Sequence, residues 1–166
     1  MIFENLIKEN KEAFKNRLLE IARELNVTAD NLMFVFWFET AHTLNHRIQN
    51  ARTKATGLIQ FMPATAKELG TTVEELKSMS NVEQLEYVRK YFSRYRGKMK
   101  DWLDVYLVVF YPSLIGKPDD YKITRDIVAI QNPIFDRNKD LDISKSEIRK
   151  TLLIQMPEEA KKVLVA

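Results

Sequence analysis

The chain has 166 residues, a usual length for one domain and enough to bury a substantial core. It is 45% hydrophobic and 30% charged, as ordinary globular proteins are, and it has no cysteine, which excludes disulfide frameworks and thiolate metal sites. The net charge of +3 is compatible with an anionic partner such as a cell-wall polymer, a nucleic acid or a lipid surface, and does not choose among them.

The first ten residues alternate charged and apolar side chains. They lack the basic start and the continuous apolar run of a secretory signal. No stretch is long enough to span a bilayer, since the apolar run at residues 32–38 is far too short. We therefore expect a protein made in the cytoplasm, without a membrane span, that reaches a target outside the cell by another route.

Two helices are predicted at the start of the chain. Residues 9–25 place apolar side chains at helical spacing between Lys, Arg and Glu, which indicates an amphipathic helix. Residues 28–30 offer N-cap side chains for a second helix. Residues 32–38 of that helix are all apolar, and a helix that is apolar all round belongs in a core.

Glu39 follows this apolar run directly. Burial there would raise the pKa of its carboxyl group, and a carboxylic acid still protonated near neutral pH can serve as a general acid. The alternative is that Glu39 is simply the first exposed residue after a core segment.

Residues 40–56 are polar and basic, and they contain no Asp or Glu. They form either a solvated surface loop or a cleft wall beside Glu39. His42 and His46 are four residues apart, but no third ligand is nearby, which disfavours a zinc site. Hydrogen bonds to a substrate and capping of the helix end are the other roles open to them.

Residues 55–70 are the most patterned stretch. Gly57 permits a close backbone approach or an unusual φ, Pro63 suits the first turn of a helix, and Gly70 ends that helix. Gln60 is the polar residue within the apolar run 58–62. It is either a buried amide bonded to backbone or an amide that faces a ligand.

Further helical segments make the chain mainly α. A Thr72–Glu75 capping box opens a short helix, and Ser80 or Asn81 caps a helix over residues 82–95. A strongly apolar helix over residues 102–111 is ended by Pro112. After a turn at 116–120, the type of a short apolar segment at 126–131 is undecided.

The pair Glu39-Thr40, followed after a polar segment by Gly-Leu-Ile-Gln-Phe-Met-Pro-Ala-Thr-Ala at residues 57–66, resembles the soluble lytic transglycosylases, relatives of the goose-type lysozymes. Motifs of that family read Glu-Ser, then Gly-Leu-Met-Gln, usually followed by Met-Pro-Ala-Thr-Ala, and later Ala-Tyr-Asn. The resemblance covers residues 26–121 and is strongest to domains of phage and prophage tail or lysis proteins.

The resemblance implies a lysozyme-like helical domain with a two-lobed glycan cleft over residues 1–131. It implies that Glu39 is the catalytic acid and base, with no catalytic cofactor. The partner would be the glycan strands of peptidoglycan and not nucleic acid. The protein would be a monomer or a domain of a phage tail or lysis protein. The residues implied in substrate binding are Thr40, Gly57, Gln60, Phe61, Tyr106 and Tyr111.

One motif departs from the family pattern. Val-Phe-Tyr-Pro at residues 109–112 stands where the family has Ala-Ala-Tyr-Asn. Tyr111 is the closest match to the family tyrosine that contacts the catalytic acid, with Tyr106 as a rival, and the family asparagine is missing.

Residues 40–56 offer no second carboxylate for a two-acid glycosidase. Their composition therefore favours a substrate-assisted reaction that yields a 1,6-anhydro sugar. Hydrolysis remains an alternative if Asp101 or Asp104 folds into place. A glycan-binding module without turnover is a second alternative. A nucleic-acid binder is disfavoured, because the basic residues form no clustered stripe.

Residues 136–147, within a C-terminal extension at 132–166 expected to pack on the same domain, fit an EF-hand calcium loop. The ligands would include the side chains of Asp136, Asn138, Asp140 and Glu147 and the backbone carbonyl of Asp142, and the ion would be structural. Leu141 occupies the position usually held by glycine, where a left-handed backbone costs about 1 kcal/mol. The alternative is that Glu147 only completes a helix capping box with Ser144.

Overall fold

The computed structural model describes residues 1–165, which are mainly helical, as the sequence predicts. The helices are α1 Lys11–Leu25, α2 Ala29–Glu39, α3 Pro63–Glu68, α4 Val73–Ser78, α5 Asn81–Ser93, α6 Trp102–Phe110, α7 Asp126–Gln131, α8 Lys145–Gln155 and α9 Glu158–Leu164. Single 3-10 turns lie at Glu4–Leu6 and Pro112–Leu114. Strands β1 (Lys122–Ile123) and β2 (Ile143–Ser144) form one antiparallel pair.

The predicted helix starts are confirmed by their hydrogen bonds. The Thr28 hydroxyl accepts the backbone N–H of Asn31 at 3.1 Å and begins α2. Ser80, rather than Asn81, caps α5. The complete capping boxes are Thr72 with Glu75, Ser80 with Glu83, and Ser144 with Glu147.

Helix α2 runs through the hydrophobic core, with residues 32–37 all buried. It packs against α1, α6 and α9. The ring of Phe34 meets Trp102 of α6 edge-on at 5.7 Å. Because partners surround α2, its apolar side chains are buried on every face, as the sequence predicts.

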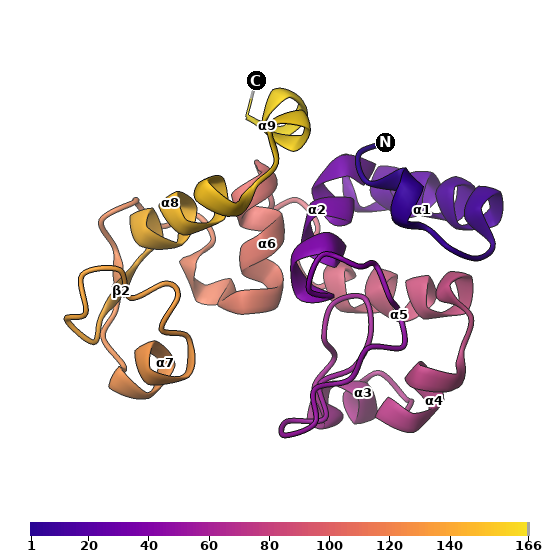
Figure 1. Cartoon of the computed structure of the whole chain (residues 1–166), viewed down its shortest axis with the longest axis horizontal. Coiled ribbons are helices and arrows are strands. Elements are labelled where there is room, and N and C mark those ends of the chain that lie inside the picture. The colour runs from indigo at the N-terminus through magenta and orange to yellow at the C-terminus, as the bar shows by residue number, and fades with distance from the viewer. Residues whose placement is uncertain (166) are drawn as a thin grey trace.

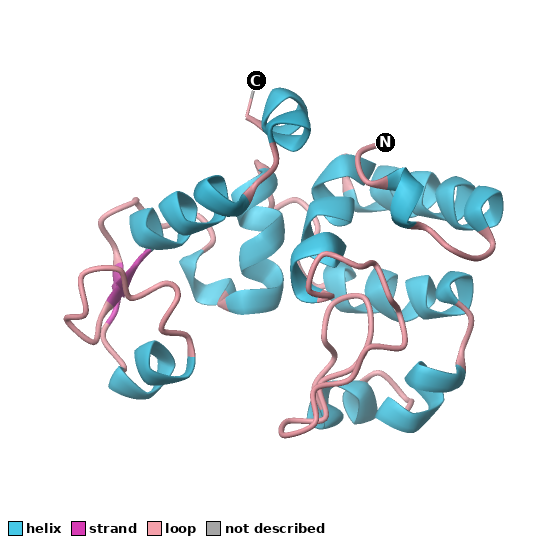
Figure 2. Cartoon of the chain, in the orientation of Figure 1, coloured by secondary structure: helices cyan, strands magenta, loops and turns pink. Residues whose placement is uncertain are grey.

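The helices form two groups joined at α6 (Figure 1). Helices α1, α2 and α5 lie together, with α3, α4 and the long segment between α2 and α3 below them in this view. Helices α7 and α8 and the strand pair lie on the other side of α6. Figure 2 shows that the segment between α2 and α3 contains no helix. Backbone bridges from Thr56 to Gln49 and to Phe61 order this segment instead.

The C-terminal extension packs on the rest of the protein. Ile143 of β2 lies opposite Ile123 of β1, and both are buried in the same core as α2. Lys145 at the start of α8 forms a buried ion pair with Asp104 of α6, with Nζ 3.5 Å from Oδ1. Neither the strand pair nor α9 is predicted by the sequence. None of the helices in residues 1–165 has the length and apolar character to cross a bilayer.

Candidate functional site

Glu39 is the last residue of α2. Its side chain is half-buried, and burial raises the pKa of its carboxyl group to about 7. Burial is the one cause of this shift, since no neighbouring charge in residues 1–165 contributes to it. Near neutral pH a substantial fraction of the Glu39 carboxyl groups therefore keeps its proton, as a general acid requires.

Two tyrosines lie near this carboxyl group. Tyr106 of α6 is 1% exposed, and its ring packs edge-on against Phe38 at 5.3 Å. Burial and, secondarily, the charge of Glu39 raise the pKa of Tyr106 well above its usual value. Burial likewise raises the pKa of Tyr91 on α5 to about 12, with a small contribution from Glu39. Tyr91 donates its hydroxyl hydrogen bond to the Val108 carbonyl at 3.0 Å.

Tyr91 lines a small cavity of about 60 Å³. Glu39 is not among the residues that line this cavity; the charge of Glu39 makes a small contribution to the raised pKa of Tyr91. The other lining residues are Ile59, Gln60, Phe61, Met62, Thr65 and Val109.

Gln60 combines both roles that the sequence left open. Its Nε2 donates to the Gly57 carbonyl at 3.1 Å and more weakly to the Ile48 carbonyl at 3.4 Å. The same side chain lines the cavity, and its backbone has a left-handed φ of 51°. A non-glycine residue in this region is strained, and such strain concentrates at functional sites.

The other predicted contact residues near Glu39 are mostly enclosed by protein. The Thr40 side chain is fully buried; its hydroxyl donates to the Phe36 carbonyl at 2.6 Å and accepts the Leu44 N–H at 2.8 Å. Phe61 is 2% exposed. Thr40 therefore orders the turn after Glu39, and Phe61 contributes mainly packing to the cavity wall.

Tyr111 directly follows α6 and is half-buried beside Phe110, with a ring separation of 6.4 Å. The next residue, Pro112, begins a 3-10 turn. The tyrosines whose pKa responds to the Glu39 charge are Tyr91 and Tyr106. Of the two predicted candidates, Tyr106 is thus the one with an electrostatic link to Glu39.

Asp101 and Asp104, the acids considered for a second catalytic role, are engaged elsewhere. Asp101 caps α6 and lies 3.9 Å from Arg149. Asp104 is 4% exposed and pairs with Lys145. Neither contributes to the raised pKa of Glu39. The two carboxylates that a two-acid glycosidase requires are therefore not assembled from these residues.

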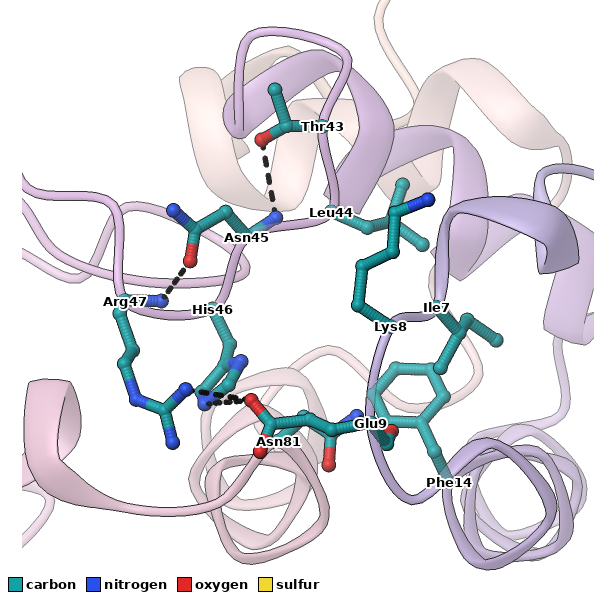
Figure 3. A pocket seen from close by; sticks show the side chains of 10 residues that line it. All are labelled: Ile7, Lys8, Glu9, Phe14, Thr43, Leu44, Asn45, His46, Arg47 and Asn81. Atoms are coloured by element: carbon teal, nitrogen blue, oxygen red, sulfur yellow. Dashed lines mark hydrogen bonds and ion pairs between the residues drawn. The ribbon is translucent and has the colours of Figure 1, made fainter.

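A second pocket, of about 210 Å³, lies between residues 7–9, the turn at 43–47 and the start of α5 (Figure 3). Glu9 reaches across it to Arg47 at 2.6 Å and to His46 Nε2 at 3.5 Å. His46 also contacts the Met79 carbonyl at 3.1 Å, and burial lowers its pKa. This group ties the N-terminal segment to the turn after α2.

His42 does not converge with His46. Its ring stacks on Trp37 with centroids 3.8 Å apart, whereas His46 faces Met79 and Glu9. Across residues 1–165, no three His, Cys, Asp or Glu side chains are grouped so as to hold a metal ion.

The loop at residues 136–147 is closed by hydrogen bonds from its own carboxylates. Asp136 accepts the N–H of Asp140 at 3.1 Å and of Leu141 at 3.2 Å. Leu141 has the expected left-handed backbone, with φ of 66°. Lys122 of β1 places its ammonium 3.1 Å from Asp140 and 3.5 Å from Asp142. A cation entering the loop would therefore compete with Lys122.

The two carboxylate oxygens of Glu147 have different surroundings, and one of them bears on metal binding. Its Oε2 accepts the Ser144 N–H and hydroxyl hydrogens at 2.9 and 2.8 Å, which completes the capping box. Its Oε1 is buried and has no hydrogen-bond partner among residues 1–165. A buried carboxylate oxygen without a partner is costly, and a calcium ion would satisfy it. The other carboxylates of this loop are nevertheless not drawn together with Glu147 into a group that could hold a metal ion within residues 1–165.

Tyr91 is the site residue that the sequence analysis missed. It lies in the predicted helix at residues 82–95, where its spacing with Leu85, Val88 and Phe92 makes it look like one more core residue. The sequence feature that could have identified Tyr91 is its hydroxyl group on an otherwise apolar face, because a buried hydroxyl needs a hydrogen-bond partner.

Comparisons of the chain with protein-family models, with curated proteins and with solved structures found no match.

The burial of Glu39 predicts a pH-dependent stability difference. Its pKa is about 7 in the folded protein and 4.5 when unperturbed, so the unfolded state loses its proton first as the pH rises. The difference in free energy of unfolding between wild type and Glu39→Gln at pH 4 serves as the reference. By pH 8, the free energy of unfolding of wild type should fall by about 2–3 kcal/mol relative to that of the variant. Denaturant unfolding of both proteins across this range measures the difference, and a pH-independent difference would contradict the raised pKa.

Proposed function

We propose that this protein is a peptidoglycan lytic transglycosylase with a lysozyme-like fold. It cleaves the β-1,4 bond between N-acetylmuramic acid and N-acetylglucosamine, within a phage tail or lysis protein. The observation that carries the proposal is Glu39, a half-buried acid with a pKa of about 7, isolated from any second carboxylate. The resemblance of Glu39-Thr40 and residues 57–66 to the transglycosylase motifs supplies the substrate class.

The reaction follows from one acid that acts twice. The Glu39 carboxyl group donates its proton to the glycosidic oxygen as the bond from C1 of N-acetylmuramic acid breaks. The acetamido group of that sugar stabilises the positive charge that develops at C1. The resulting Glu39 carboxylate then removes the proton of the 6-hydroxyl, whose oxygen bonds to C1. The product is a 1,6-anhydro sugar, no water is consumed, and Glu39 regains its proton.

A muramidase that hydrolyses the same bond with two acids is less well supported, because Asp101 and Asp104 are paired with cations away from Glu39. A binding module without turnover is also less well supported. A protein that only binds glycan gains nothing from a desolvated acid, and burying that acid costs stability above its unperturbed pKa.

Mass spectrometry of the soluble products tests the reaction type. Purified peptidoglycan is treated with wild type and with Glu39→Gln, which removes the acid but keeps the shape. We expect wild-type products that end in anhydro sugars, one water lighter than hydrolysed chains, and no products from the variant. Hydrated reducing ends would overturn the transglycosylase in favour of a muramidase, and the absence of products from wild type would favour the binding module.

The electrostatic link between Glu39 and Tyr106 predicts which tyrosine supports the acid. Tyr106→Phe removes a hydroxyl near the reacting carboxyl group, so kcat/KM should fall about tenfold to a hundredfold. Tyr111→Phe serves as the matched control at the end of the same helix and should change kcat/KM less than threefold. The reverse ranking would assign the supporting role to Tyr111.

We also propose that residues 136–147 bind a structural calcium ion. The side chains of Asp136, Asn138, Asp140 and Glu147 would hold it, together with the backbone carbonyl of Asp142. The buried Glu147 Oε1 without a partner and the loop-closing Asp136 support this assignment. When bound, the ion would tie this loop more firmly to α8, and it takes no part in the reaction at Glu39.

Substitution of Leu141 tests the calcium proposal. Leu141 is 44% exposed and left-handed, so Leu141→Gly relieves backbone strain of about 1 kcal/mol with little loss of packing. If calcium binding fixes this conformation, Leu141→Gly should bind calcium up to about fivefold more tightly in isothermal titration calorimetry. Asp136→Ala should abolish binding, while Asp119→Asn outside the loop should not. Wild type and Leu141→Gly that both fail to bind calcium at millimolar concentration would refute the site.

A further inference from the structure

The carboxamide of Gln84, near the start of α5, is fully buried and fully bonded. Its Oε1 accepts the Leu58 N–H at 2.7 Å. Its Nε2 donates to the carbonyls of His46 and Leu76, both at 2.9 Å. Both donor hydrogens and the oxygen of this amide are thus used to join the segment between α2 and α3 to α4 and α5.

Gly57 is the position that makes room for this carboxamide. A Cβ atom on residue 57 would lie 2.4 Å from Gln84 Oε1 and 2.7 Å from its Nε2, closer than any real contact. Gly57 also has φ of +83°, which favours glycine. The motif glycine therefore packs against Gln84, and its bare Cα is what allows the amide to reach Leu58.

The segment fixed by Gln84 is the one that carries Gln60. The Gln60 amide donates to the Gly57 carbonyl at 3.1 Å, and the Gly57 N–H donates to the Ile48 carbonyl at 2.9 Å. Gln60 itself has a strained left-handed backbone, which persists only where the surroundings hold it. The bonds from Gln84 to Leu58, two residues before Gln60, supply such a constraint.

Helix α5 also carries Tyr91, which lines the same cavity as Gln60. Gln84 and Tyr91 are seven residues apart, two helical turns, and so project from the same face of α5. One helix thereby sets the position of the Gln60 segment and of Tyr91 together.

We propose that Gln84 is a positioning residue, which holds residues 57–61 so that Gln60 keeps a fixed place in the cavity that it lines together with Tyr91. The proposal rests on the proposed function for the identity of the substrate, and on geometry alone for the anchoring. Gln84 does not touch the substrate, so its loss should weaken substrate binding and alignment while leaving the chemistry of Glu39 intact.

The test compares Gln84→Met, which keeps the length of the side chain but removes all three hydrogen bonds, with Thr71→Val. Thr71 is a similarly buried polar residue of the same region, and its hydroxyl bonds to Glu75 instead of to residues 57–61. Amide hydrogen exchange, thermal unfolding and peptidoglycan kinetics are measured for both variants at a temperature where both are folded.

We expect Gln84→Met to speed exchange of the Leu58 amide at least tenfold and to lower kcat/KM about tenfold or more, mainly through KM. Thr71→Val should lose less thermal stability, because it removes one buried hydrogen bond instead of three, and should keep kcat/KM within about twofold. Faster Leu58 exchange with unchanged kcat/KM would overturn the positioning role, as would an equal loss of kcat/KM in the control.

Failure of the proposed function is recognised separately. If wild type yields no peptidoglycan products, the anchoring is judged by the exchange rates of residues 57–61 and by the NMR shifts of the Gln60 side-chain amide. Unchanged values in Gln84→Met would then refute the anchoring itself. Gly57→Ala provides an independent check, because its Cβ displaces the same carboxamide and should reproduce the faster exchange at Leu58.

Discussion

The desolvation of Glu39 is the constraint on which the candidate site depends, and it follows from the burial of α2. A helix packed against α1, α6 and α9 must be apolar on every face, so a polar group can appear only at its end. Glu39 occupies that end, where burial disfavours its carboxylate form. The same packing that stabilises the fold therefore keeps the acid protonated near neutral pH, and ionisation of Glu39 costs folding free energy.

The segment after α2 turns back sharply, and several of its residues adopt a left-handed backbone conformation to do so. Ala41, His42, Leu44, Lys54 and Gln60 all have left-handed φ values, although none is glycine. Such residues are strained one by one and hold their conformation through surrounding contacts. Those contacts include the hydroxyl of Thr40 and the Glu9 group drawn in Figure 3, as well as Gln84. The polar composition of residues 40–56 thus reflects internal anchoring as much as solvent contact.

Local rules in the sequence were sufficient for most of the helices, though not for α7 and α9, and for the placement of Glu39 at the end of a buried helix. Thr28, Ser80 and Ser144 act as caps because N-cap hydrogen bonds depend on residues only three apart. The left-handed backbone of Leu141 was foreseeable from the loop spacing. Contacts between distant segments were not foreseeable. Gln84 and Leu58 are 26 residues apart, and Lys145 meets Asp104 across 41 positions, so no periodicity or motif connects them. For the same reason the sequence left Tyr106 and Tyr111 as rivals and passed over Tyr91.

The pairing of Asp104 links the C-terminal extension to the chemistry proposed for Glu39. A buried carboxylate near the core is stable only with a cation beside it, and Lys145 of α8 provides that cation at 3.5 Å. Without α8, Asp104 would lose this cation and keep the hydrogen bond that its Oδ2 accepts from the Lys100 N–H at 3.1 Å. Attachment of the extension therefore keeps Asp104 paired with Lys145 on α6, the helix that also carries Tyr106. On this view the extension helps to maintain a site with a single acid, which is the condition for a reaction that closes the sugar on itself instead of adding water.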